Sequence, residues 1–239
     1  MYPFPPAILH DLSFDIFESF LVKYNFKYNL KNLEGAIIMV FVTLGQTPRD
    51  DVIPELFKII GKTLNYKEIG LLDDPSNIEK AKPSENEEFL VTRLRDGNEV
   101  KLSRRWVEKV LKRIPHQEEM TVLLCTDDVN IDGYILPSKI LRYFASIMKP
   151  EKLGIVVPEP GQIEMVRGKW KSIARDIKIV SYSPYTHIFN DLSILKDRDL
   201  VILDCIGYAL REEEFVKKYT EGIVVSARKL LGNFLRSIL

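Results

Sequence analysis

Short apolar runs alternate with segments of helical periodicity from residue 36 to the last residues of the chain. The apolar runs predict strands over residues 36–44, 66–71, 121–125, 152–157, 177–180, 200–205 and 222–225. The amphipathic segments predict helices over residues 50–61, 104–114, 138–148, 161–174, 211–219 and 227–238. Strands of Val, Ile and Leu separated by helices are typical of parallel β-α-β units. The pattern therefore predicts an α/β fold with largely parallel sheets flanked by helices.

A segment between the second and third of these strands follows a different pattern, in which apolar and polar residues alternate. Asp96-Gly97 separates its two halves, residues 89–95 and 98–102. Asp-Gly between two alternating runs is a strong signal for an antiparallel hairpin. We therefore expect a hairpin inserted into the otherwise parallel fold.

The alternating pattern divides at Lys149-Pro150-Glu151. We expect two compact lobes, an N-terminal one over residues 36–150 and a C-terminal one over residues 151–239. The last helix is expected to pack back on the first lobe.

Residues 1–35 precede this pattern and are rich in aromatic side chains. The one element that they predict is a short helix over residues 12–22. We interpret the stretch as an N-terminal extension or as a start of translation assigned too far upstream, because Met39 lies inside the first predicted strand.

Charge and composition exclude several classes of protein. Lys and Arg number 34 and Asp and Glu also number 34, so the sequence has no basic excess for binding nucleic acid. The longest apolar run has nine residues, about half of the roughly 18 that a transmembrane helix needs, so we expect no membrane partner. Two cysteines and the lack of a signal-peptide pattern favour a cytoplasmic protein with free thiols. The oligomeric state stays open, and a homo-oligomer is compatible with the sequence.

Motifs for common cofactors are absent from the sequence. It has no Walker loop, no Gly-x-Gly-x-x-Gly, no Gly-x-Ser-x-Gly and no Cys-x-x-Cys, and its three histidines are scattered. We therefore expect neither a cofactor nor a metal.

Polar residues follow the first predicted strand, in Gly45-Gln-Thr-Pro-Arg-Asp-Asp51. Thr47 suits a helix N-cap and Pro48 the first helical turn. Capping does not explain Gly45, Gln46 and Arg49. A glycine, free backbone N–H groups and an arginine can together hold a carboxylate or a phosphate.

The two cysteines, Cys125 and Cys205, each end a predicted strand, one in each half of the chain. Taken singly, each is compatible with a small buried hydrophobic residue. At strand ends, however, backbone N–H groups and a helix dipole can lower a thiol pKa. Two thiols that face each other across a cleft could then exchange protons with a substrate as a pair. A disulfide is a third interpretation, disfavoured in a reducing compartment.

Two arginines and a tryptophan outside these motifs allow more than one interpretation. Arg93 and Arg95 share one face of the predicted hairpin and are either solvated or line a cleft. Trp170 is interpreted as a residue of the core or of an interface.

Four motifs in order resemble the signature of the AroM family. They are Gly45-Gln-Thr-Pro-Arg49, Leu90-Val-Thr-Arg-Leu-Arg-Asp-Gly97, Leu123-Leu-Cys-Thr126 and Asp204-Cys-Ile-Gly-Tyr208. The resemblance covers about residues 39–238 and links the chain by name to aromatic amino-acid biosynthesis. It also implies an architecture related to the aspartate/glutamate and hydantoin racemases, cofactor-independent enzymes with two α/β lobes and one cysteine from each.

The resemblance implies roles for the matching residues. Cys125 and Cys205 correspond to the catalytic pair. The corresponding substrate-binding positions are Gly45, Gln46, Thr47, Thr126, Asp204, Gly207 and Tyr208. Asp127-Asp128 departs from the pattern, because two acidic groups beside the first cysteine disfavour an aspartate or glutamate substrate.

Two functional hypotheses result. The first is a cofactor-independent racemase, epimerase or related isomerase or lyase that acts on a small carboxylate. Cys125 and Cys205 would be the paired acid and base, and Arg49 or the backbone N–H groups of residues 45–47 would hold the carboxylate. The second is a binding or regulatory protein that senses a small anionic metabolite in the same cleft. An open cleft with the two sulfur atoms facing each other would favour the enzyme.

Overall fold

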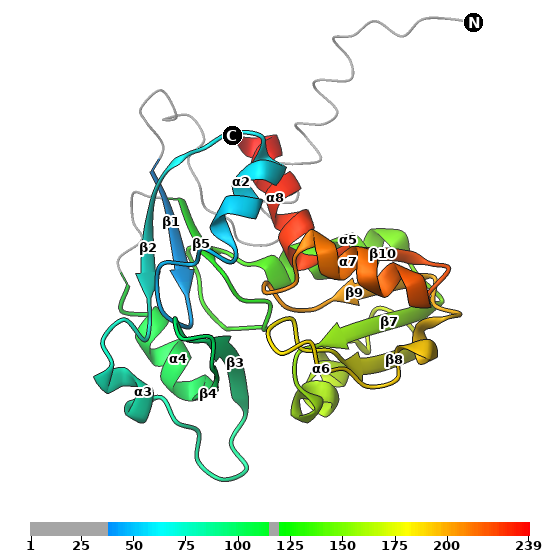
Figure 1. Ribbon diagram of the computed structural model, residues 1–239, viewed down its shortest axis with the longest axis horizontal. Helices are drawn as coiled ribbons and strands as arrows, with labels where there is room; N and C mark the ends of the chain where they lie inside the picture. The colour runs from blue at the N-terminus through cyan, green and yellow to red at the C-terminus, as the bar shows by residue number, and fades with distance from the viewer. Residues whose placement is uncertain (1–37, 115–119) are drawn as a thin grey trace, which may run out of the picture.

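Two four-stranded parallel sheets form the centre of the protein (Figure 1). The computed structural model describes residues 38–114 and 120–239, so the predicted extension and its helix over residues 12–22 lie outside the described residues. The first sheet has the order β2 (Asn65–Gly70), β1 (Ile38–Thr43), β5 (Met120–Leu123) and β6 (Tyr134–Ile135). The second has the order β10 (Ile223–Ser226), β9 (Leu200–Leu203), β7 (Lys152–Val157) and β8 (Asp176–Ser181).

Strand register is parallel throughout both sheets. In the first sheet Met39 pairs with Tyr66 on one side and with Met120 on the other. In the second sheet Leu153 pairs with Ile177 and with Leu200. All four strands of each sheet therefore present their carboxyl ends at the same edge.

The hairpin forms a separate two-stranded sheet of β3 (Phe89–Arg93) and β4 (Glu99–Ser103). Its turn is longer than Asp96-Gly97 alone, since the Leu94 N–H donates to the Asn98 carbonyl at 2.9 Å. Gly97 has φ +93° and adopts a conformation that L side chains rarely take. The hairpin prediction is confirmed.

Helices connect the strands and cover the sheets. They are α2 (Ile53–Ile60), α3 (Ser76–Lys80), α4 (Arg104–Leu111), α5 (Pro137–Met148), α6 (Ile163–Trp170), α7 (Leu210–Val216) and α8 (Ala227–Ile238), with short 3₁₀ turns η2 (Pro160–Gln162), η3 (Leu192–Leu195) and η4 (Lys217–Tyr219). None of the helices in residues 38–114 and 120–239 combines the length and apolarity needed to cross a membrane. The predicted α/β class, with parallel sheets flanked by helices in two lobes, is confirmed.

Side-chain alternation along the strands builds one core between the lobes and two outer cores. Met39 and Phe41 of β1 belong to the central core together with Ile155 of β7 and Ile202 of β9. The intervening Val40 packs in a second core with the hairpin and α4. Because successive side chains point to opposite faces of a strand, both faces of each sheet are buried.

The last helix joins the two lobes. α8 packs against α2 of the first lobe and against α5, as the red and light-blue helices of Figure 1 show. The contact is close at Gly232, where a Cβ atom would lie 2.6 Å from Cγ2 of Ile59. Any larger residue there would push α8 away from α2. The lobe boundary at residues 150–151 stays a prediction.

Several element boundaries differ from the predicted ones. α2 begins at Ile53 instead of residue 50, because the Arg49 carbonyl closes a turn with the N–H groups of Val52 and Ile53. Thr47 is therefore not its N-cap. The predicted strands over residues 121–125 and 200–205 end at Leu123 and Leu203. Strand β6, α3 and η3 were not predicted, since elements of two to five residues carry little periodicity.

Candidate active site

The carboxyl ends of both sheets meet at a small buried cavity. Its lining residues follow β1, β5, β7, β8 and β9 or belong to β3 and η2: Leu44, Arg49, Val91, Thr92, Leu124, Cys125, Thr126, Asp127, Pro158, Gln162, Tyr185, Asp204, Cys205 and Ile206. The edge outside the carboxyl ends of parallel strands is where α/β proteins bind ligands. The cavity volume is about 20 Å³, which is room for roughly one water molecule. The site is therefore closed in this structure.

One cysteine from each lobe faces this cavity. Cys125 follows β5 of the first lobe, and Cys205 follows β9 of the second. Each sulfur accepts a hydrogen bond from the backbone N–H two residues later, from Asp127 at 3.4 Å and from Gly207 at 3.4 Å. The two thiols thus occupy equivalent turns at the ends of equivalent strands.

Burial dominates the acidity of both thiols. It raises the pKa of Cys125 strongly, and the neighbouring Asp127 carboxylate adds to the increase. Burial also raises the pKa of Cys205, to about 11, although the Gly207 N–H, Tyr185 and Arg49 act in the opposite direction. The expectation of lowered thiol pKa values is wrong for this closed site, because the loss of hydration outweighs the N–H groups. Burial thus favours the protonated form of both cysteines in the closed site.

Tyr185 closes the site, and sequence reasoning missed it. It lines the cavity from the segment after β8, and its hydroxyl lowers the pKa of Cys205 there. Burial raises the pKa of this hydroxyl well above 10. Gly207 makes room for the ring, since a Cβ atom there would lie 2.5 Å from the Tyr185 hydroxyl. No periodicity marks Tyr185, whose position depends on a loop.

The Tyr185 loop, residues 183–190, is anchored at its base. The Tyr208 hydroxyl donates to the Tyr182 carbonyl at 2.5 Å, so Tyr208 supports the loop instead of lining the cavity. The Ser183 hydroxyl donates to Glu99 of the hairpin at 2.5 Å and accepts from the Tyr185 N–H at 3.2 Å. The Ser183–Glu99 hydrogen bond thereby holds the loop of the second lobe against the hairpin of the first.

Arg49 reaches the cavity with its charge already paired. Its Nε and Nη2 donate to the two carboxylate oxygens of Asp51 at 2.7 and 2.8 Å, and Nη1 donates to Thr43 at 2.7 Å. Burial alone would lower the pKa of Arg49, but the Asp51 bond reverses the effect and the net pKa is raised. A bidentate partner in place leaves Arg49 poorly suited to hold the carboxylate of a ligand.

Gly45, Gln46 and Thr47 do not line the cysteine cavity. Thr47 donates through its N–H and hydroxyl to Asp73, both at 2.8 Å, and the Gln46 amide donates to the Leu72 carbonyl at 3.1 Å. A Cβ atom at Gly45 would lie 2.4 Å from the Arg93 carbonyl. These contacts fix the position of the loop after β1 relative to the hairpin.

A buried polar cluster joins the lobes behind the cysteines. The Lys169 ammonium donates to both Asp204 oxygens at 2.7 and 2.8 Å and to the Thr126 carbonyl at 2.6 Å. The Thr126 hydroxyl donates to the Asp204 carbonyl at 3.0 Å, and the Trp170 indole donates to the Asp204 carboxylate at 2.7 Å. Thr126 and Asp204 line the cavity, but their polar groups are engaged in this cluster. Lys169 was not predicted, and Trp170 is buried in the central core, where its ring meets the cluster.

Two more polar side chains line the cavity. The Asp127 carboxylate accepts from Arg104 at 3.3 Å and lies 3.9 Å from the Cys125 sulfur, and burial raises its pKa. Gln162 is 5% exposed, and its buried Oε1 has no hydrogen-bond partner among the residues that the structure describes. A buried polar atom without a partner is unfavourable unless something else satisfies it, so Gln162 is a candidate ligand contact.

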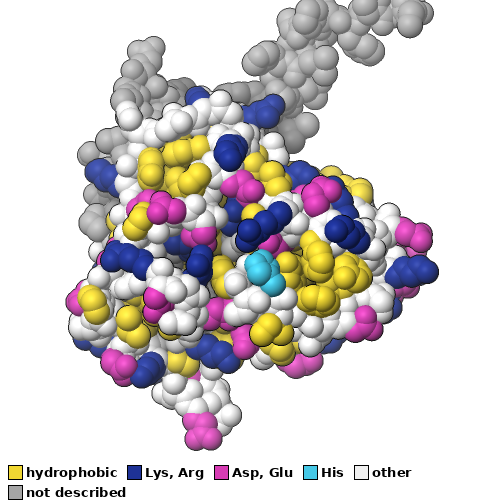
Figure 2. Space-filling view, viewed as in Figure 1, with side chains coloured by type: hydrophobic (Ala, Val, Ile, Leu, Met, Phe, Trp, Pro, Cys, Tyr) yellow, Lys and Arg dark blue, Asp and Glu magenta, His cyan; other side chains and the backbone are white. Residues whose placement is uncertain are grey.

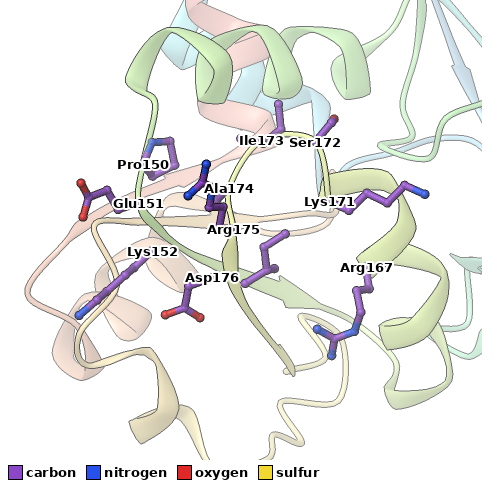
Figure 3. Close-up of a pocket in the computed structure, with 11 residues that line it drawn as sticks. Pro150, Glu151, Lys152, Arg167, Lys171, Ser172, Ile173, Ala174, Arg175 and Asp176 are labelled. Atoms are coloured by element: carbon purple, nitrogen blue, oxygen red, sulfur yellow. The ribbon is translucent and has the colours of Figure 1, made fainter.

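A larger depression of about 1080 Å³ lies at the opposite end of β7 and β8, where these strands begin. Figure 3 shows its charged side chains, such as Lys152, Arg167 and Lys171, pointing outward and away from one another. A binding site needs convergent polar groups. Among the residues that the structure describes, no group of three metal-binding side chains is placed to hold an ion.

The site and fold together define an α/β protein of two parallel-sheet lobes with one cysteine from each lobe at their junction. The chain belongs to the AroM family, whose description is AroM protein and which matches residues 39–239. The resemblance inferred from the four sequence motifs is thereby confirmed. No curated protein matches the sequence significantly.

Solved structures with similar folds share little sequence with the chain. Allantoin racemase from Klebsiella pneumoniae is 9% identical, with a TM-score of 0.45 over 84% of this chain and 87% of that one. Glutamate racemase from Aquifex pyrophilus is 12% identical, with a TM-score of 0.46 over 85% and 84%. The maleate isomerase Iso from Pseudomonas putida S16 is 10% identical, with a TM-score of 0.46 over 84% and 92%.

Proposed function

We propose that this protein is a cofactor-independent isomerase, of the racemase or epimerase type, that moves a proton on a small carboxylate with two cysteines. The observation that carries the proposal is the matched pair of strand-end thiols. Cys125 and Cys205 come from different lobes, line one cavity and accept equivalent backbone N–H bonds. Two opposed thiols can serve the two faces of one carbon atom.

The surroundings of the two thiols differ, and the difference supports distinct resting roles. Cys205 has the Arg49 charge, the Tyr185 hydroxyl and the Gly207 N–H beside it, all of which favour a thiolate. Cys125 has Asp127 beside it, which favours the thiol. In the first direction, the Cys205 thiolate takes the α-proton, the C–H electron pair passes to the adjacent carboxyl or carbonyl group, and the Cys125 thiol donates a proton to the opposite face. The reverse reaction exchanges the two roles.

The site has to open before it can accept a substrate, because its volume is about 20 Å³. Movement of the Tyr185 loop would enlarge it. Entry of a ligand would also hydrate or replace the surroundings of the thiols, which lowers the cost of forming a thiolate. The Gln162 oxygen without a partner would accept a hydrogen bond from an amino or hydroxyl group of the substrate.

A second candidate function is a binding protein for a small anionic metabolite, linked through the family name to aromatic amino-acid biosynthesis. The closed cavity and the two protonated thiols favour it. Both candidates suit a reducing cytoplasm, where thiols stay free. A homo-oligomer is compatible with either.

Proton exchange distinguishes the two candidates. The protein is incubated in D₂O with a panel of amino and hydroxy acids, and deuterium at Cα is followed by NMR. We expect at least one compound to exchange and to racemise. Cys125→Ser and Cys205→Ser should each lower racemisation by several orders of magnitude, while each still exchanges the α-proton of one enantiomer. Arg105→Gln, an exposed change on α4, is the matched control.

Two other outcomes would contradict the proposed isomerase mechanism. Binding of a compound without exchange supports the binding protein. Turnover that survives at the wild-type rate in both serine variants contradicts the cysteine mechanism.

A further inference from the structure

A second pocket adjoins the cysteine cavity and is lined by three arginines. It has a volume of about 270 Å³ and shares Arg49 with the cavity. Its lining residues are Gln46, Pro48, Arg49, Asp50, Asp51, Arg93, Leu94 and Arg95. Figure 2 shows Lys and Arg side chains interspersed with Asp and Glu side chains in the middle of this face, where the two lobes meet.

Two of the three arginines are paired with carboxylates. Arg49 is held by both oxygens of Asp51. Arg95 contacts Asp73 at 3.1 Å. Asp50, the remaining acidic residue of the pocket, is exposed to solvent, so its charge is screened.

Arg93 is different. Among the described residues it has no ion pair or hydrogen bond of its guanidinium group, and its Nε is buried without a partner. Its Cζ lies 5.9 Å from the centre of the Tyr185 ring. A guanidinium group with a buried N–H donor and no acceptor is suited to a bound anion.

The hairpin sets the distance between this arginine and the cysteines. Val91 lines the cysteine cavity, and Arg93 lies two residues further along β3, on the same face of the strand. A two-residue step in a strand is about 7 Å. Arg93 lines the arginine pocket and not the cysteine cavity, so a group that it binds is separate from the group beside the thiols.

We propose that Arg93 binds a second, distal anionic group, so that the ligand is a small molecule with two acidic groups. The ligand would place its reacting carbon between Cys125 and Cys205 and its far carboxylate or other anionic group on Arg93. Tyr185 lies beside Arg93 and lines the cysteine cavity, so displacement of this one side chain would connect the two pockets. This inference rests on the proposed function for the position of the reacting carbon.

The acidic residues after Cys125 lie away from the arginine pocket. Asp128 points to Arg142 on α5, and Asp127 contacts Arg104 on α4. Neither lines the arginine pocket. They therefore do not repel an anion in the arginine pocket, although Asp127 lines the cysteine cavity.

Binding of two simple probes tests the proposal. Glutarate and butyrate are titrated calorimetrically at equal ionic strength into the full-length protein. We expect wild type to prefer glutarate by about tenfold or more, as for one charge-assisted bidentate contact. Arg93→Gln should remove the preference, whereas Arg105→Gln, with the same loss of charge on an exposed site, should keep it.

Equal binding of the two probes to wild type, including no detectable binding of either, overturns the proposal. So does a full preference for glutarate in Arg93→Gln with an unchanged melting temperature. The Cys125→Ser/Cys205→Ser double variant separates this inference from the proposed function. An Arg93-dependent preference that persists in it, with no proton exchange in wild type, supports the anion site while refuting the isomerase.

Discussion

Reactivity at the level of single residues depends on burial more than on residue type. Cys125 and Cys205 have the N–H donors that usually activate a thiol, yet both have raised pKa values. The polar groups beside the two cysteines still give them different pKa values. Cys205 is the more acidic one, and it is also less completely buried than Cys125.

Alkylation with iodoacetamide tests this order. At pH 7.5 both cysteines should react more slowly than in the urea-unfolded chain, and Cys205 should react faster than Cys125. The rate at Cys205 should rise about tenfold per pH unit beyond pH 9, since its thiolate fraction grows until the pH nears the pKa of about 11. The unfolded chain should instead level off above about pH 8.5. Peptide mass spectrometry measures both rates, and a faster Cys125 or a plateau near pH 8.5 in the native protein would contradict the assignment.

Short loops, more than helices or strands, position the groups of the site. The parallel strands end at one edge of each sheet, but the segments after them decide which atoms face the cavity. The turn after β9 holds Cys205, and the Tyr185 loop is packed against Gly207. The site is closed because these two segments are in contact.

Gly207→Ala should open the site. The added Cβ would lie 2.5 Å from the Tyr185 hydroxyl and 2.8 Å from its Cζ, so the ring has to leave its place. We expect faster alkylation of Cys205 and a loss of about 1–3 kcal/mol in the free energy of unfolding, the usual cost of overpacking. The matched control is Gly168→Ala on α6, where nothing lies within 4 Å of the new Cβ and Ala favours the helix. Wild-type alkylation of Cys205 in Gly207→Ala would show that Tyr185 does not shield the thiol.

A shared core and a buried polar cluster hold the two lobes together. Strands from both sheets contribute to the central core, and α8 packs across the junction. Behind the cavity, Lys169 and Asp204 of the second lobe bond to Thr126 of the first. The side chains of Lys169 and Asp204 are only 8% and 1% exposed, so their charges depend on each other.

Lys169→Met should lower the free energy of unfolding by about 3–5 kcal/mol, because it leaves the buried Asp204 charge without its partner. The double variant Lys169→Met/Asp204→Asn should recover part of that loss. Lys217→Met, which breaks an exposed pair with Glu214, should cost less than about 1 kcal/mol and serves as the control. Urea unfolding measures all three, and equal stability of Lys169→Met and Lys217→Met would refute the role of the cluster.

Sequence patterns alone predicted the parallel strands, most of the helices and the hairpin. Each of these elements has local periodicity or local turn chemistry, as in β1 and in Asp96-Gly97. The pairing of Cys125 with Cys205 was also suggested by their equivalent places at two strand ends. Such patterns are local and can be read along the chain.

Only the tertiary structure decided how the polar groups are engaged. Arg49 and Arg93 are both arginines near a strand end. Asp51 pairs with Arg49, whereas Nε of Arg93 has no hydrogen-bond partner among the described residues. Tyr185 carries no local signal and reaches the site through a loop. The thiol pKa values depend on burial by segments from both lobes, which no local pattern contains. The sequence by itself thus determined the elements and the candidate cysteines, while packing between distant segments decided which charges are free and whether the site is open, because hydration and ion pairing are properties of the assembled chain.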